Sequence, residues 1–261
     1  MESVYVIKIG GNVIDNENSL RSFLKDFALI QGKKILVHGG GKIATKIGEQ
    51  LNIMPNYVNG RRITDAATID LVTMVYGGLI NKKIVAQLQS LSCNAIGLTG
   101  ADGNIIPANK RVVGDIDYGF VGDPTEDLDP SSLQTLLENG LTPVLAPLTH
   151  GKGQVLNTNA DTIASVMAVA LSKKNKVRLI YCFEKKGVLD DVNNEASVIT
   201  LITKQIYQQL QEQNKLQDGI LPKLQNAFNA IDKGVSEIVI GHADDLLKNI
   251  STENCGTLIK A

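Results

Sequence analysis

Val4-Tyr5-Val6-Ile7-Lys8-Ile9-Gly10-Gly11 is the stretch that decides the fold: a β-branched, apolar run that carries one lysine and ends in two glycines. Such a run predicts a buried strand, in which a lysine ammonium must be either paired or desolvated. The two glycines allow a sharp turn and a close approach of the backbone to a bound group. The alternative for Lys8 is a lysine at a sheet edge that extends its stem to reach water.

A second run, Lys34-Ile35-Leu36-Val37-His38-Gly39-Gly40-Gly41, repeats this pattern. Between the two runs, apolar residues at helical spacing predict a helix over about 20–30, with Asn18 or Ser19 as its cap. The resulting βαβ unit brings both glycine turns to one sheet edge, which predicts a shared anion site, with phosphate as the expected anion. Neither turn matches the Walker or the dinucleotide-binding pattern, and a purely structural turn is the alternative for each.

The composition is typical of a globular protein, with 43% hydrophobic and 20% charged residues among 261. Lys plus Arg number 26 against 27 Asp plus Glu, so no basic excess favours nucleic acid or a membrane surface as a partner. The three cysteines are widely spaced, which is typical of reduced thiols. Because a strand is predicted within a few residues of Met1, we expect no signal peptide and a cytoplasmic location.

The rest of the chain alternates between strand and helix patterns, which predicts an α/β protein with a mostly parallel sheet covered on both faces. A long helical region over 65–91 is expected to be two helices broken near Gly77-Gly78. The glycine-rich and proline-rich region 104–129 predicts hairpins at the sheet edge. Residues 173–176 are the expected hinge between two lobes.

Two polar segments precede predicted helices in the second half of the chain. Asn157-Thr158-Asn159-Ala160-Asp161 holds more amide and carboxylate groups than a helix cap requires, although one of them is expected to be only a cap. Asp218-Gly219-Ile220-Leu221-Pro222-Lys223 places a lysine in a first helical turn, where the helix dipole disfavours it. Such exceptions are often functional, and an exposed lysine is the alternative for Lys223.

The remaining candidates are Arg61 and Arg62, one of which is suited to pair with a substrate carboxylate, unless both are simply solvated. No nucleophile motif surrounds any serine or cysteine, and no zinc pattern occurs, so no metal held by the protein is expected. A carboxylate that accepts a phosphoryl group is already ionised at neutral pH and needs no general base. Lysines, an aspartate that orients them and glycine N–H groups would suffice for such a transfer.

At this point the sequence resembles the amino acid kinase family, and within it the branch that acts on N-acylated glutamate. The opening glycine motifs are common to the family. The segments Asn59-Gly60-Arg61-Arg62-Ile63-Thr64 and Asn157-Thr158-Asn159-Ala160-Asp161 are similar to those of the acylglutamate branch. The resemblance extends over the full chain, through Asp218-Gly219 and Lys223 to Gly256-Thr257.

This resemblance implies a role for each matching residue. Lys8 and Lys223 would neutralise the phosphoryl group in transfer, Asp161 would organise both lysines, and Gly11 and Gly41 would donate backbone N–H bonds to that group. Gly10 would shape the turn. Gly40, Arg62, Asn157 and Asn159 would hold the acylglutamate, and Gly10, Lys8, Lys223 and Phe183 would meet the nucleotide.

The resemblance also implies an open three-layer αβα sandwich with about eight strands, in a single domain over 1–261. Its N-terminal lobe, 1–174, would bind the acylglutamate, and its C-terminal lobe, 175–261, would bind ATP with Mg²⁺. The implied activity is ATP-dependent phosphorylation of the side-chain carboxylate of N-acetyl-L-glutamate or N-succinylglutamate in arginine biosynthesis. A homodimer is implied as well.

One segment departs from the family pattern. The family usually has a strand that ends in Thr or Ser, Asp and Val before a glycine, whereas this chain has Tyr181-Cys182-Phe183-Glu184-Lys185-Lys186-Gly187. The segment belongs to the nucleotide lobe. Two alternatives therefore stay open: a kinase of the same fold acting on carbamate, aspartate or UMP, and a binding homologue without catalysis.

The arginine-inhibited members of the family carry an extra N-terminal helix, which this sequence lacks. We therefore expect arginine to leave the activity unchanged. Turnover measured with and without added arginine checks this expectation, and a clear drop in rate would contradict it.

Overall fold

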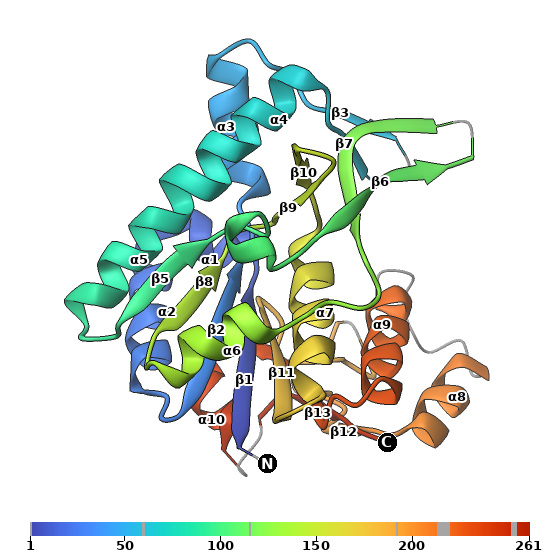
Figure 1. Cartoon of the computed structure of the whole chain (residues 1–261). Coiled ribbons are helices and arrows are strands. Elements are labelled where there is room, and N and C mark those ends of the chain that lie inside the picture. Colours follow the sequence, from blue (N-terminus) through green and yellow to red (C-terminus); the bar gives the residue numbers. More distant parts are fainter. Residues whose placement is uncertain (1, 59–60, 115, 192, 213–219, 252–254) are drawn as a thin grey trace.

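The computed structural model describes residues 2–58, 61–114, 116–191, 193–212, 220–251 and 255–261. Within these ranges, a central eight-stranded sheet forms the core of the molecule (Figure 1). All neighbouring strands are parallel except β13 and β14. The predicted α/β class with a mostly parallel sheet is confirmed. The strand order is β12 (Leu201–Ile202), β14 (Thr257–Ile259), β13 (Glu237–His242), β11 (Lys176–Phe183), β1 (Ser3–Ile9), β2 (Lys33–His38), β8 (Thr142–Leu145) and β5 (Ala95–Leu98).

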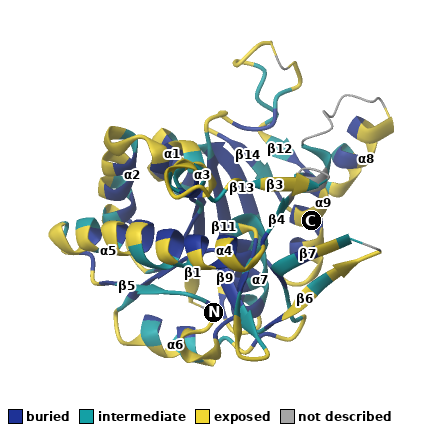
Figure 2. Ribbon diagram, turned by 90° about the horizontal axis from the view of Figure 1, so that it is seen from above, coloured by how far each residue is buried: buried dark blue, intermediate teal, exposed yellow. Residues whose placement is uncertain are grey.

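Helices cover both faces of this sheet, and Figure 2 shows the buried strands between helices with exposed outer sides. Four helices pack on one face: α6 (Ser131–Glu138), α7 (Ala160–Ser172), α8 (Lys204–Glu212) and α9 (Leu221–Asp232). The other face carries α1 (Gly11–Asp15), α2 (Glu17–Leu29), α3 (Gly41–Gln50), α4 (Ala66–Val72), α5 (Asn81–Ser90) and α10 (Leu246–Ile250). Two apolar cores result, one on each side of the sheet.

Strand alternation decides which core each residue of β1 and β2 faces. Val4 and Val6 belong to the core under α7 and α9, whereas Ile7 and Ile9 belong to the core under α2 and α5. Lys8 therefore lies on the α7 side of the sheet. By the same alternation, Val37 faces the α7 side and His38 faces the α5 side.

The predicted hairpin region forms β6 (Ala108–Val113) and β7 (Ile116–Pro124). The prediction that it lies at the edge of the main sheet is wrong. Because β7 pairs with β10 (Gln154–Asn157), which pairs with β9 (Leu148–Gly151), the hairpin belongs to a separate four-stranded sheet. A third, two-stranded sheet joins β3 (Asn56–Val58) to β4 (Arg61–Ile63).

The predicted break near Gly77-Gly78 is also wrong. Between α4 and α5 the chain stays helical as a π-helix, Thr73–Ile80, so that the whole region appears as one long helix in Figure 1. A Cβ on Gly77 would lie 3.4 Å from side-chain atoms of Leu148 and Thr99, so this face of the helix packs against both residues. Short 3₁₀ turns occur at Asp102–Asn104 and Ala243–Asp245.

The helix predicted after the first glycine turn begins earlier than expected. Asn16, rather than Asn18 or Ser19, is its cap, and its side-chain oxygen accepts bonds from the N–H groups of both of those residues. The short helix α1 precedes it and was not predicted. Five residues are too few for a hydrophobic period to be recognised.

The connection between the two predicted lobes is tight. Asn175, just after α7, is buried, and its amide donates to Gln134 Oε1 and to the Leu171 carbonyl, both at 3.0 Å. Strand β1 pairs with β2 on one side and with β11 on the other, so the ranges 1–174 and 175–261 share one sheet. The division into an acylglutamate lobe and a nucleotide lobe stays a prediction.

Cys93 and Cys182 are buried free thiols, as predicted. Within the described ranges, each helix is too short or too polar to span a lipid bilayer.

Burial of His38 makes the stability of the fold depend on pH. Burial lowers the pKa of its imidazole from 6.5 to about 4. The unfolded chain therefore takes up a proton below about pH 6.5 that the folded chain does not take up until about pH 4. We expect this residue to reduce the free energy of unfolding by up to about 1.4 kcal/mol per pH unit across that window, and to have no effect above it. Urea denaturation measures the slope, and an identical slope in a His38→Asn variant would contradict the assignment.

Candidate active site

The lysine of the opening strand is paired with an aspartate from a distant helix. Lys8 is only 7% exposed, and its Nζ lies 2.7 Å from Asp161 Oδ1. Asp161 is in the first turn of α7, where the side chain of Asn159 caps the helix by accepting bonds from the N–H groups of Asp161 and Thr162. Strand alternation on β1 and the start of α7 thus bring together two residues that the sequence separates by more than 150 positions.

A second lysine approaches the same place from the last part of the chain. Lys223 lies in the first turn of α9, and its Nζ is 4.0 Å from the centroid of the Phe183 ring. Lys8 Nζ is 4.7 Å from the same centroid. Phe183, the last residue of β11, therefore contacts both ammonium groups through cation–π interactions. In the segment that departs from the family pattern, an aromatic ring meets the predicted catalytic lysines.

The two glycine turns lie next to each other, as the sequence predicted. Gly10 donates its N–H to the Cys182 carbonyl at 3.2 Å, and a Cβ on Gly39 would lie 3.7 Å from Gly11 N. Gly11 and Gly41 are the first residues of α1 and α3, so their N–H groups have no partner within those helices. The carboxyl edge of β1 and β2 therefore presents backbone donors beside Lys8.

Arg62 is held over the second glycine turn by two side chains that the sequence did not single out. Its Nη2 donates to Thr45 Oγ1 at 2.6 Å and to the Tyr57 hydroxyl at 2.9 Å. The Gly41 carbonyl is 3.5 Å away. Thr45 lies one helical turn after Gly41, and Tyr57 lies across the β3–β4 hairpin from Arg62. The sequence signals that could have identified these residues are the spacing of Thr45 from Gly41 along the helix and the position of Tyr57 opposite Arg62 in the hairpin.

Asn157 and Asn159 both precede α7: Asn157 is the last residue of β10, and Asn159 is the N-cap of the helix. Asn157 Nδ2 donates to Thr64 Oγ1 at 3.1 Å, and Thr64 directly follows the strand that carries Arg62. The capping bonds account for the side-chain oxygen of Asn159, in agreement with the expectation that one of these residues is a cap. Contact of either asparagine with substrate stays a prediction.

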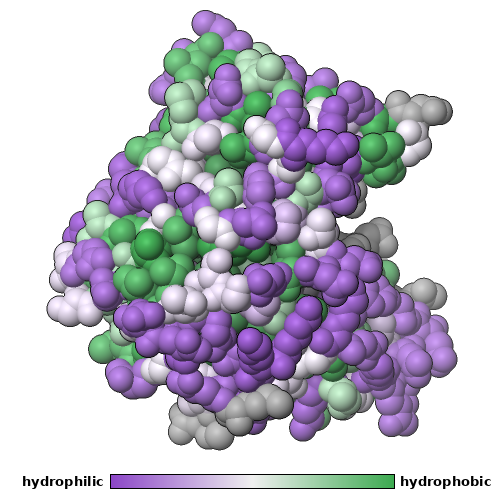
Figure 3. Space-filling view, in the orientation of Figure 1, coloured by the Kyte–Doolittle hydropathy of each residue, from purple (hydrophilic) through white to green (hydrophobic). Residues whose placement is uncertain are grey.

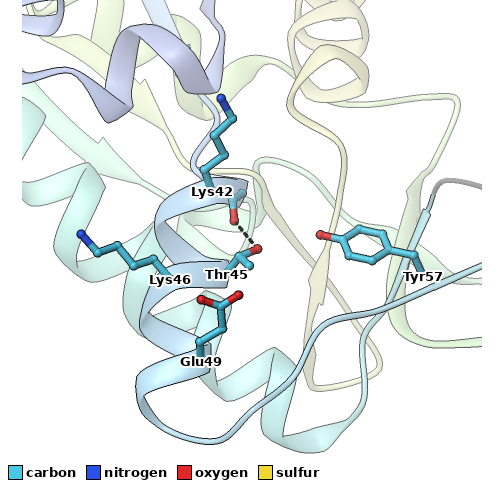
Figure 4. A pocket seen from close by; sticks show the side chains of 6 residues that line it. Lys42, Thr45, Lys46, Glu49 and Tyr57 are labelled. Carbon is cyan, nitrogen blue, oxygen red and sulfur yellow. Dashed lines mark hydrogen bonds between the residues drawn. The ribbon is translucent and has the colours of Figure 1, made fainter.

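Two hollows border this group of residues. One of about 470 Å³ is lined by Gly41, Lys42, Thr45, Lys46, Glu49 and Tyr57. In Figure 4, Tyr57 faces Thr45 across it, whereas Lys42 and Lys46 point away from it. The other, of about 280 Å³, lies between α7 and α9 and includes Asp161 in its wall. In Figure 3 the outline is indented between the projecting β6–β7 hairpin and the α8–α9 region. Space for ligands thus lies next to both Arg62 and Asp161.

Two parts of the predicted site lie outside the described residues, namely Asn59 with Gly60 and Asp218 with Gly219.

The Tyr181 phenol and the Cys182 thiol, on the strand beside Lys8, stay protonated at neutral pH. Burial raises the pKa of the Cys182 thiol to about 12, and it also raises the pKa of the Tyr181 hydroxyl. The Tyr181 hydroxyl donates to the Asp161 carbonyl at 3.3 Å. The site supplies positive charge and backbone N–H donors. Such a site suits the transfer of an anionic group, which depends more on orienting the reactants than on moving a proton.

Comparison with known proteins gives consistent matches. Residues 3–242 match the model of the amino acid kinase family. The acetylglutamate kinase of Cytophaga hutchinsonii is 54% identical over 264 residues, covering 100% of both chains. The acetylglutamate kinase of Bacteroides thetaiotaomicron is 54% identical over 260 residues, covering 99% of both chains. Among solved structures, smu.665 from Streptococcus mutans is 29% identical, with a TM-score of 0.75, and the match covers 99% of this chain and 98% of that one.

The ion pair between Lys8 and Asp161 predicts unequal effects of removing either partner. Asp161→Asn leaves a buried ammonium without its carboxylate, and we expect a loss of about 3 kcal/mol in the free energy of unfolding. Lys8→Met leaves the Asp161 Oδ1 atom buried without a partner, but the side chain as a whole is 31% exposed, so a smaller loss of about 1 to 2 kcal/mol is expected. Urea denaturation measures both values. The double variant should resemble Lys8→Met, and equal losses in the two single variants would contradict this account.

Proposed function

Since this chain belongs to the amino acid kinase family, we propose that it transfers the γ-phosphoryl group of ATP to the side-chain carboxylate of N-acetyl-L-glutamate. N-succinylglutamate is the alternative acceptor. The products are an acyl phosphate and ADP, and the reaction belongs to arginine biosynthesis. The observation that carries the proposal is the convergence of Lys8 and Lys223 on the Phe183 ring, with Asp161 paired to Lys8, next to two glycine turns.

In this proposal, the bond between the γ-phosphorus and the bridging oxygen of ADP breaks as an oxygen of the acceptor carboxylate bonds to phosphorus. No proton moves, because the acceptor is ionised at neutral pH. Lys8 and Lys223 neutralise the charge of the transferring group, and Asp161 keeps Lys8 fixed. The N–H groups of Gly11 and Gly41 bind that group, and Gly10 shapes the turn between β1 and α1. Such preorganised donors are a major source of rate acceleration in phosphoryl transfer.

The acceptor is assigned to the side of the site that Arg62 occupies. The Arg62 guanidinium and the Asn157 amide bind the carboxylates of the acylglutamate, with Gly40 and Asn159 completing the contacts. Thr45 and Tyr57 support this role by fixing the guanidinium before a ligand arrives. ATP enters with its Mg²⁺ on the side of Lys223 and Phe183. We propose a cytoplasmic homodimer, with the acylglutamate lobe over 1–174 and the ATP lobe over 175–261.

The two lysines provide a direct test. We expect Lys8→Met or Lys223→Met to lower kcat by about a hundredfold to a thousandfold, because each removes a charge that stabilises the transition state. Lys204→Met is the matched control, since Lys204 pairs with Asp232 on α8 and α9, away from the glycine turns. ADP release with N-acetyl-L-glutamate as acceptor measures the effect, and near-normal turnover in either site variant would exclude its assigned role.

A panel of acceptors tests the substrate itself. N-acetyl-L-glutamate, N-succinylglutamate, carbamate, aspartate and UMP are compared with ATP as donor. Turnover with carbamate, aspartate or UMP alone would identify another kinase of this fold. Titration with MgATP in a calorimeter completes the test, because the absence of binding would indicate a homologue without catalysis.

A further inference from the structure

A buried polar pair lies behind the second glycine turn, on the face of the sheet opposite to Lys8. His38 and Asn81 are both 0% exposed. His38 Nδ1 lies 2.7 Å from the Gly39 carbonyl, and its Nε2 lies 3.2 Å from Asn81 Nδ2. A carbonyl can only accept, so Nδ1 carries the proton, and Nε2 accepts from the Asn81 amide. Burial lowers the pKa of His38 to about 4, which keeps this neutral form at physiological pH.

The Asn81 amide has a partner for each of its atoms. Its Nδ2 also donates to the Val144 carbonyl at 2.9 Å, and its Oδ1 accepts from Lys82 Nζ at 3.2 Å. A Cβ on Gly97 would lie 1.9 Å from Asn81 Oδ1, so only glycine leaves room for the amide. The orientation of Asn81, and through it that of His38, is therefore fixed by a satisfied network.

This network sets the direction of one backbone N–H group. The Gly39 carbonyl and the Gly40 N–H belong to the same peptide unit, and the described chain contains no cis peptide bond. In a trans peptide, the carbonyl and the N–H point in opposite directions. Because His38 holds the Gly39 carbonyl on the α5 side, the Gly40 N–H is directed away from that side.

The π-helix supplies a second restraint on the same turn. Gly40 has φ of 153°, and a Cβ there would lie 2.4 Å from Ile80 Cδ1 and 3.1 Å from Tyr76 Cδ1. In a π-helix the hydrogen bonds join residues i and i+5, so residue i+5 lies nearer to the face of residue i than in an α-helix, where it is rotated by about 140°. The wider turn thus brings Tyr76, Ile80 and Asn81 to one face of the helix, against the glycine turn.

We propose that His38 and Asn81 are positioning residues for phosphoryl transfer, which fix the peptide between Gly39 and Gly40 so that the Gly40 N–H is directed at the bound acceptor. This inference rests on the proposed function. The π-helical segment Thr73–Ile80 is the element that makes the arrangement possible, because it aligns Asn81 with the residues that contact Gly40.

Two substitutions of His38 separate positioning from simple filling of space. His38→Leu removes the donor to the Gly39 carbonyl. In the His38→Asn variant, the side-chain amide nitrogen takes the place of Nδ1 and restores that donor. We expect His38→Leu to raise KM for N-acetyl-L-glutamate by about tenfold or more, with KM for ATP within twofold of the unmodified enzyme. His38→Asn should stay within about threefold on both. Equal kinetics in the leucine and asparagine variants, or equal changes in both KM values, would overturn the proposal.

Two further measurements keep the proposal testable if His38→Leu does not fold. Asn81→Leu removes the donor to His38 from a different element and should raise the same KM selectively. In the unmodified protein, the Gly40 amide resonance should shift on addition of N-acetyl-L-glutamate without ATP, and an unchanged resonance at saturation would overturn the inference. An unmodified enzyme that neither binds nor phosphorylates this acceptor would instead refute the proposed function.

Discussion

The buried ammonium of Lys8 is the constraint on which the rest of the site depends. Lys8 lies in a central strand that pairs with a strand on each side, and its side chain is only 9% exposed, so its charge must be compensated largely inside the protein. Asp161 compensates it at 2.7 Å, and this requires the first turn of α7 to lie over the end of β1. The Asn159 cap fixes where that turn begins. One electrostatic requirement therefore places a helix, a strand and a glycine turn relative to one another.

The sheet divides the remaining tasks between its two faces. On the α7 side lie the charged groups: Lys8, Asp161 and Lys223, with the Phe183 ring in contact with both ammonium groups. On the α5 side lies the network of the neutral His38 and Asn81 side chains, in which His38 contacts the backbone of the turn and Asn81 is held by the Val144 carbonyl and the Lys82 ammonium. Charge on one face and rigid hydrogen bonding on the other leave the glycine N–H groups at the edge between them. This division explains why a fully buried histidine occurs next to a site whose proposed chemistry needs no general base.

Much of the fold was predictable because it depends on local patterns. The apolar runs of β1 and β2, the helix between them and the glycine turns at their ends follow from spacing alone. The errors have physical reasons as well. Asn16 precedes two other polar residues able to cap α2, and nothing local decides among them. Gly77-Gly78 predicts a helix break because glycine weakens an α-helix, yet the segment stays helical between α4 and α5, with the buried Val75, Tyr76 and Ile80 packed in the core.

The sequence by itself determined the class of fold and the residues on which the candidate site is centred, because an unusual residue type in a regular pattern is visible without coordinates. Lys8 in a strand and Lys223 at a helix start are such exceptions. Only the tertiary structure decided how these residues meet and what supports them. The contacts of Thr45 with Arg62, of Phe183 with two lysines, and of Asn81 with His38 join segments that are separated in the sequence. Such contacts arise from strand order and helix packing, which no local spacing encodes.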